Sequence, residues 1–182
     1  MRREFVLWKS GRWQLSAVPS APVGWLALWI IFSMLGAAVL KLPTGEAVIG
    51  GALAAAVHVL SETVHQLGHA WAARRTGWPM SGLRYWGVLG ASVYPADEPD
   101  LPSAIHLRRA LGGPLASLSL GATAAIVARL LWPAAGLAFW LAAFTALDNL
   151  LVLGLGAFLP LGFTDGSTIL KYARFRSGGR HD

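Results

Sequence analysis

The chain has 182 residues, enough for one domain; 55% are hydrophobic and 13% are charged. A soluble domain carries about twice that charged fraction, and the mean hydropathy is +0.53, so the composition favours a protein that lies in a bilayer. The net charge of +6 comes from basic residues that flank apolar runs, which argues against nucleic acid as a partner. The absence of cysteine excludes disulfides and thiolate metal sites.

The first apolar run predicts a membrane helix over residues 23–40, after a basic N-terminal segment at residues 1–22. The run is longer than the apolar core of a typical signal peptide, so we expect an uncleaved helix. A short turn with proline and glycine follows. The second predicted helix covers residues 46–73 and is followed by two arginines.

The segment after the second helix changes character. Residues 82–95 are rich in β-formers and are punctuated by glycine and proline, which predicts a short hairpin or sheet. A brief amphipathic surface helix is expected at 103–111, followed by membrane helices at 114–132 and 137–159 and a basic tail at 172–182. The predicted fold class is an all-α polytopic membrane protein with about four transmembrane helices and a small β insertion between the second and third.

The distribution of basic residues predicts the orientation of the chain. With a cytoplasmic N-terminus, all 15 lysines and arginines fall in inner segments except Lys41 and Arg129. Positive charge accumulates on the cytoplasmic side of membrane proteins. We therefore expect an integral protein of a prokaryotic-type plasma membrane, with both termini cytoplasmic and the lipid bilayer as a partner.

The second predicted helix carries a polar stripe formed by His58, Glu62, His65 and His69. At about 100° per residue these four side chains lie within an arc of about 60° on one face. A lone buried histidine is usually a hydrogen-bonded core residue. Ionisable groups inside a membrane span are costly and usually line a polar interior or cavity, and four on one stripe favour a functional site.

The spacing of His65 and His69 allows both imidazoles to bind one metal ion. A zinc site needs a third protein ligand and an open position. Asp165 follows the fourth helix on the inner side, where the second helix also ends, whereas Asp148 lies deeper and could hydrogen-bond a ligand histidine or another buried group. The candidates for the third ligand are His58, Glu62, His106, Asp148 and Asp165.

Three segments resemble the site-2 protease family of intramembrane zinc metalloproteases. HQLGHAWAARRTG resembles the H-E-x-G-H segment of the family but has Gln66 in place of the glutamate, and GGPLASL resembles the start of the next helix. NLLVLGLGAFLPLGFTDG resembles the segment that ends in D-G; Pro160 and Asp165 keep the spacing, and Ala157 stands where asparagine is common. The resemblance covers roughly residues 50–172, and the motifs occur in the order of the family.

The resemblance implies a single membrane-embedded metalloprotease-like domain over 1–182, with Zn²⁺ as cofactor and His65, His69 and Asp165 as ligands. It implies peptide-bond hydrolysis by zinc-activated water, with the transmembrane segment of another protein as substrate or client. An exposed strand edge within 82–95 would hold the unwound substrate. The predicted substrate-binding residues are Tyr85, Gly87, Val88, Gly90 and Ser92, and the residues expected to support the ligands are His58, Asp148 and Asn149.

Gln66 occupies the position of the general base. Its amide can accept a hydrogen bond but is not a usable base, and general base catalysis is worth about a hundred- to ten-thousand-fold. Three explanations stay open: a natural pseudoprotease that binds membrane segments, a protease inactivated by a Glu-to-Gln change, or another carboxylate acting as base. Glu62 is the candidate substitute, although its position favours a supporting role beside a ligand histidine. A small membrane transporter with a polar relay through His58, Glu62 and Asp148 is a further alternative.

Overall fold

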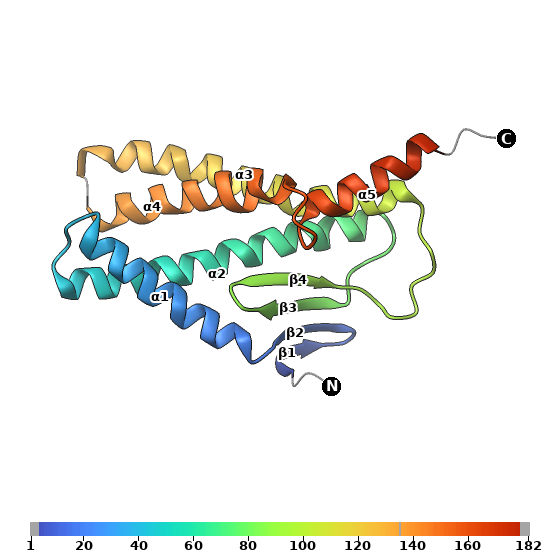
Figure 1. Cartoon of the computed structure of the whole chain (residues 1–182), viewed down its shortest axis with the longest axis horizontal. Helices are drawn as coiled ribbons and strands as arrows, with labels where there is room; N and C mark the ends of the chain where they lie inside the picture. Colours follow the sequence, from blue (N-terminus) through green and yellow to red (C-terminus); the bar gives the residue numbers. More distant parts are fainter. Residues whose placement is uncertain (1–3, 135, 179–182) are drawn as a thin grey trace.

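Four long apolar helices form most of the computed structural model, which describes residues 4–134 and 136–178 (Figure 1). Each is long and apolar enough to cross a membrane, and many of their large apolar side chains are exposed on the outside of the bundle, as expected of a protein whose solvent is lipid. The prediction of four membrane helices is confirmed. The helices are α1 (Ser20–Ala38), α2 (Thr44–Arg75), α3 (Ser103–Leu131, extended by the 3₁₀ turn η1, Trp132–Ala134) and α4 (Leu137–Leu147), which continues as η2 (Asp148–Leu155) and η3 (Gly156–Phe158).

The third helix begins earlier than predicted, because the expected surface helix at 103–111 and the expected span at 114–132 are one continuous helix, α3. Pro114 lies inside α3 and is buried. Proline is tolerated in membrane helices where neighbouring groups satisfy the backbone atoms that it releases. The GGP segment therefore does not begin a helix; it is a point of close packing within one.

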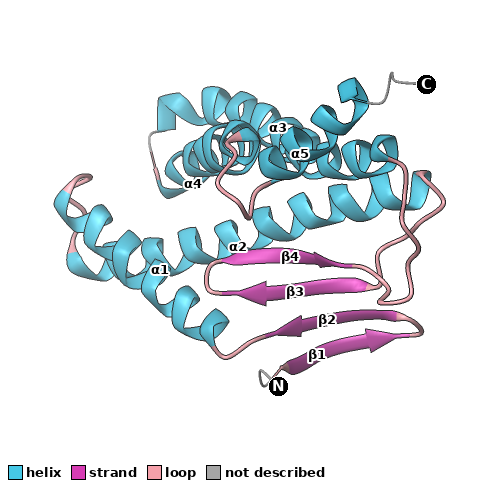
Figure 2. Cartoon of the chain, turned by 45° about the vertical axis from the view of Figure 1, so that its right-hand side comes forward, coloured by secondary structure: helices cyan, strands magenta, loops and turns pink. Residues whose placement is uncertain are grey.

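The small sheet was predicted only in part. Its order is β1–β2–β3–β4, with the predicted hairpin formed by β3 (Gly82–Trp86) and β4 (Leu89–Val93). The structure adds β1 (Phe5–Ser10) and β2 (Trp13–Ala17) from the segment that we expected to be merely basic. β2 pairs with β3 in parallel and the other two pairs are antiparallel (Figure 2).

The sheet lies beside the C-terminal half of α2, with β4 nearest to that helix (Figure 2). Leu83 and Tyr85 of β3 are buried against Ala17, Ala21 and the ring of Trp25. Gly87 forms the β3–β4 turn with a φ of +55°, a conformation that favours glycine. These contacts fix the hairpin against α1 and α2, so that β4 faces the polar stripe of α2.

The last helix, α5 (Asp165–Gly178), packs on α3 at the end of the bundle where α2 also ends (Figure 1). Gly166 is required at its start, because an added Cβ would collide with the carbonyl oxygen of Phe158. Asp165 is thereby held at the first turn of α5 beside the bundle. The predicted basic tail at 172–182 falls partly within α5, and residues 179–182 lie outside the described residues.

Candidate metal centre

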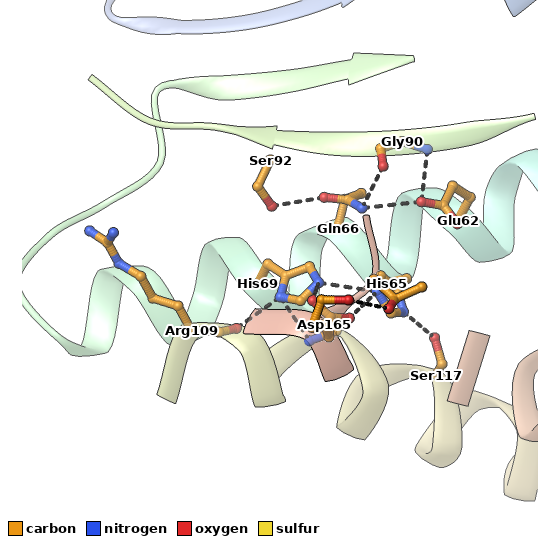
Figure 3. A network of polar contacts seen from close by, with 12 residues as sticks. Glu62, His65, Gln66, His69, Gly90, Ser92, Arg109, Ser117 and Asp165 are labelled. Carbon is orange, nitrogen blue, oxygen red and sulfur yellow. Dashed lines mark hydrogen bonds and ion pairs between the residues drawn. The ribbon is translucent and has the colours of Figure 1, made fainter. Parts of the chain in front are cut away.

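Side chains from α2 and α5 meet at one point in the structure (Figure 3). The Nε2 atoms of His65 and His69 are 3.1 Å apart. Asp165 places Oδ2 at 3.2 Å from the Nε2 atom of His65 and Oδ1 at 3.2 Å from that of His69. One potential ligand atom from each residue lies within 4.8 Å of the others, and both histidines are buried. The structure therefore brings together the two histidines and the distant aspartate.

The outer nitrogen of each histidine is held by α3. The Nδ1 atom of His69 is 2.8 Å from the carbonyl oxygen of Arg109, which can only accept, so this nitrogen carries the proton. The Gly113 amide nitrogen is 3.2 Å from the same atom; this longer contact would need the opposite tautomer, so the shorter bond decides. The Nδ1 atom of His65 is 2.9 Å from the hydroxyl of Ser117. Neither partner was predicted from the sequence.

This arrangement fits a bound cation. With a proton on each Nδ1, both Nε2 atoms present lone pairs toward each other and toward the carboxylate oxygens of Asp165. Lone pairs that face one another at hydrogen-bond distance are repulsive unless a proton or a metal ion lies between them. Two imidazoles and a carboxylate are also the ligands that catalytic zinc sites use, with an outward N–H bond fixing each ring.

The backbone of α3 closes one side of the cluster at Gly113. An added Cβ there would lie 2.7 Å from Cδ2 of His65 and still nearer to the Nε2 atoms of both histidines. Gly112 allows an equally close approach to Gly68 where α2 and α3 cross. The glycines of the GGP segment thus allow the backbone of α3 to lie directly against the histidines.

Gln66 points from α2 toward β4 (Figure 3). Its Nε2 atom donates to the carboxylate of Glu62 and to the carbonyl oxygen of Gly90, each at 3.1 Å. Its Oε1 atom accepts from the hydroxyl of Ser92 at 2.9 Å. The position of the expected base therefore carries an amide whose two N–H groups and oxygen all have partners.

Glu62 does not contact a histidine by any hydrogen bond among the described residues. Its Oε1 atom accepts from Gln66 and, at 2.8 Å, from the backbone N–H of Gly90. The side chain is 3% exposed and borders the same cavity as the histidines. These contacts join Glu62 to β4 and not to a ligand histidine, beside which we expected it.

The three supporting residues predicted on α2 and the fourth helix form contacts of their own. The Nδ1 atom of His58 is 3.1 Å from both carboxylate oxygens of Asp148, and its Nε2 atom is 3.2 Å from the carbonyl oxygen of Val88. Asn149 donates to the hydroxyl of Ser61 at 2.7 Å. Asp148 takes the second of its two predicted options and binds another buried group, His58.

The predicted strand residues divide into two groups. Gly90 and Ser92 border the cavity. Tyr85 is buried, and its hydroxyl meets that of Thr63. Gly87 and Val88 form the turn, where they contact Ser20 and His58.

The cavity has a volume of about 910 Å³ and lies between β4, α2, α3 and the segment that leads into α5.

An ion pair borders the cavity. Arg109 binds both carboxylate oxygens of Glu98, at 2.6 and 2.9 Å, and its guanidinium stacks over the ring of Tyr94. The bonds from Arg109 hold the pKa of Glu98 below its ordinary value, and burial raises the pKa of the Tyr94 hydroxyl.

Comparisons with known proteins point to one family. No protein-family model matches the chain. The chain is 32% identical over 161 residues to "Putative zinc metalloprotease Rip3" from two strains of Mycobacterium tuberculosis; the match covers 85% of this chain and 39% of those relatives. Its fold is similar to the solved "Site-2 Protease from Methanocaldococcus jannaschii", with a TM-score of 0.67, 19% identity and coverage of 98% of this chain and 74% of that one.

Proposed function

The chain belongs to the site-2 protease family of membrane zinc metalloproteases, and we propose that it acts as an intramembrane peptidase on the transmembrane segments of other membrane proteins. The observation that carries the proposal is the convergence of three ligand atoms from α2 and α5 within 4.8 Å, beside a cavity that β4 also borders. An imidazole pair and a carboxylate are a donor set for zinc.

In this proposal His65, His69 and Asp165 hold the zinc ion. Such an ion supplies a Lewis acid that polarises a carbonyl oxygen and lowers the pKa of bound water. Ser117 orients the ring of His65 and the Arg109 carbonyl orients that of His69. The carboxylate of Asp165 offsets part of the positive charge of the zinc ion. The edge of β4 positions an extended substrate through its backbone.

Gln66 limits what the chain does with these parts. An amide cannot take a proton from water, so we expect hydrolysis to be slower than with a carboxylate at this position, by about a hundred- to ten-thousand-fold. A second function is favoured by the same observation: with all its polar atoms bound to Glu62, Gly90 and Ser92, Gln66 suits a non-catalytic protein that binds membrane segments.

One experiment separates the two functions. The purified chain is incubated with a transmembrane-segment peptide beside Gln66→Glu and His69→Ala variants, and bound zinc is measured in each. We expect about one zinc per chain, lost in His69→Ala, and cleavage that is faster in Gln66→Glu. Cleavage by neither the unaltered chain nor Gln66→Glu would favour the binding function, and a chain that binds no zinc would contradict the ligand assignment.

We also propose that both termini face the cytoplasm. The start of α1, the end of α2 and α5 lie at one end of the bundle (Figure 1), and the basic residues concentrate in the segments at that end. The chain has no cysteine, so single substitutions Ser10→Cys and Gly136→Cys can report the orientation. In intact cells a membrane-impermeant maleimide should label the second variant only; labelling of the first would reverse the topology.

A further inference from the structure

The outer edge of β4 is already occupied in this structure. Residues of an antiparallel edge strand point their backbone groups alternately toward the partner strand and away from it. β4 pairs with β3 on one side, and both backbone groups of Gly90 point the other way, toward α2. The same alternation directs the backbone groups of Ser92 to this edge. It is the edge that would receive an extended substrate.

Two side chains of α2 imitate a neighbouring strand at Gly90. The carboxylate of Glu62 accepts from the Gly90 N–H at 2.8 Å, as a strand carbonyl would. The amide of Gln66 donates to the Gly90 carbonyl at 3.1 Å, as a strand N–H would. Their own bond at 3.1 Å links the two side chains. We call Glu62 and Gln66 the clasp.

The clasp requires an amide at residue 66. The carboxylate of Glu62 and the carbonyl of Gly90 only accept, so the atom that faces both must donate two hydrogens. Glutamine supplies them, and Ser92 donates to its oxygen. A glutamate here would place a second carboxylate against two acceptors and break both bonds. The surroundings of Gln66 are therefore matched to glutamine.

The clasp also requires glycine at residue 90. A Cβ on Gly90 would lie 2.9 Å from Cγ of Gln66 and 3.0 Å from Oε1 of Glu62, tighter than normal contact. A larger residue would push both side chains away from the strand. Gly90, Glu62 and Gln66 thus form one complementary unit that joins α2 to β4.

We propose that the clasp closes the peptide-binding edge of β4, and that an extended segment of a substrate opens it by replacing both side chains at Gly90. This inference rests on the proposed function for the class of substrate. The substrate carbonyl takes the place of Glu62, its N–H takes the place of Gln66, and further bonds to the backbone of Ser92 favour the exchange. A helical segment has no free backbone groups to offer, so the clasp selects segments that are already unwound.

The closed state is tested first without any ligand. Amide hydrogen exchange of the β4 peptide is measured on the full chain in detergent, for the unaltered protein, Gln66→Glu, Glu62→Ala and Glu62→Gln. Exchange of the Gly90 amide should be about tenfold faster in Glu62→Ala, which removes its acceptor, and in Gln66→Glu, where two carboxylates face each other and disrupt the clasp. Glu62→Gln is the matched control, because its amide oxygen still accepts from Gly90 and Gln66, and it should stay within about twofold. Equal exchange in all four proteins would overturn the proposal.

Opening is tested with a fluorescently labelled alternating Val-Ser peptide in the presence of a zinc chelator. Gln66→Glu and Glu62→Ala should bind the peptide about tenfold more tightly than the unaltered chain. The affinity of Ser92→Ala should lie between that of the unaltered chain and that of these two variants, and the affinity of Glu62→Gln should equal that of the unaltered chain. The same peptide with alternate backbone amides methylated should lose binding. Equal affinity in all variants, or equal binding of the methylated peptide, would overturn the proposal.

These measurements separate the clasp from the peptidase proposal. Zinc content and cleavage are determined on the same preparations. If the chain binds no zinc, but Gln66→Glu speeds Gly90 amide exchange and tightens peptide binding, the metallopeptidase proposal would be contradicted and the clasp proposal supported. A chain that binds zinc and cleaves, but shows neither effect, would do the reverse.

Discussion

Two histidine clusters lie on the same face of α2, and their partners differ in kind. At His58 each ring nitrogen faces an acceptor, the carboxylate of Asp148 or the carbonyl of Val88, so that every acceptor has a donor. At His65 and His69 the outer nitrogens are bound to α3, while the inner ones face each other and Asp165. The protein itself supplies every partner in the first cluster, whereas the second needs a proton or a metal ion between its facing atoms.

This difference shows how a metal site can be distinguished from a buried polar network when both contain histidine and a carboxylate. Residue type does not separate them, since each cluster contains histidine and aspartate in buried surroundings. The balance of donors and acceptors does. Both ring nitrogens of His58 already face oxygen atoms of the protein, so a metal ion there would have to displace an existing contact.

The largest effect is expected from removing a nitrogen of the second cluster. In His65→Ala one of the three converging ligands is lost, and the remaining two cannot close a zinc site. The variant should retain almost no zinc at equimolar metal, measured by elemental analysis after purification. His58→Ala is the matched comparison and should keep its zinc; loss of metal from both variants would erase the distinction between the clusters.

The second effect concerns stability. His58→Ala leaves Asp148 buried without its partner, and breaking a buried pair in this way costs about 3–5 kcal/mol. The free energy of unfolding in detergent should fall by that amount. In the double variant His58→Leu with Asp148→Leu both polar partners are replaced by apolar side chains, so most of the loss should be recovered. A double variant as unstable as His58→Ala would show that the pair contributes through something other than charge.

The third effect tests how α3 orients the metal ligands. Ser117 holds the outer nitrogen of His65, and such partners typically contribute 10- to 100-fold to metal affinity. Ser117→Ala should weaken zinc binding by about that factor in a chelator competition. Ser119→Ala is the control, because the hydroxyl of Ser119 is bonded only to the Leu115 carbonyl of its own helix among the described residues. Equal zinc affinity in the two variants would remove Ser117 from the site.

The sequence predicted the parts of this site that lie on one helix and one distant motif. The spacing of His65 and His69 placed them on one face, and the topology brought Asp165 to them. The contacts from α3 were not predictable, because Ser117 and the Arg109 carbonyl act through helix packing, which leaves no periodic signal. Only the glycines of GGP indicated that α3 approaches closely.

The fold shows a similar division. Apolar runs predicted the four membrane helices, since a bilayer imposes their length. Strands β1 and β2 were missed because Lys9 and Arg12 made their segment look like a basic leader, although its Phe, Val and Trp residues are β-formers. The continuity of α3 was missed because Pro114 suggested a boundary. In both cases tertiary contacts decided, the parallel pairing with β3 and the packing on α2.

The smallest effect comes from the charged pair that joins the loop before α3 to the first turns of that helix, and it sharpens the contrast with His58. Arg109 lowers the pKa of Glu98, so the pair adds stability above the ordinary glutamate value of 4.5 and loses it as the pH falls through the lowered pKa. Glu98→Gln should cost about 1 kcal/mol at neutral pH, because a neutral bond replaces a charged one. Thermal unfolding of the two proteins should therefore converge as the pH falls below 4.5. A difference in thermal stability that persists in acid would mean that Glu98 acts through packing. A change in the zinc affinity of Glu98→Gln would show that the pair is coupled to His69 through the Arg109 carbonyl.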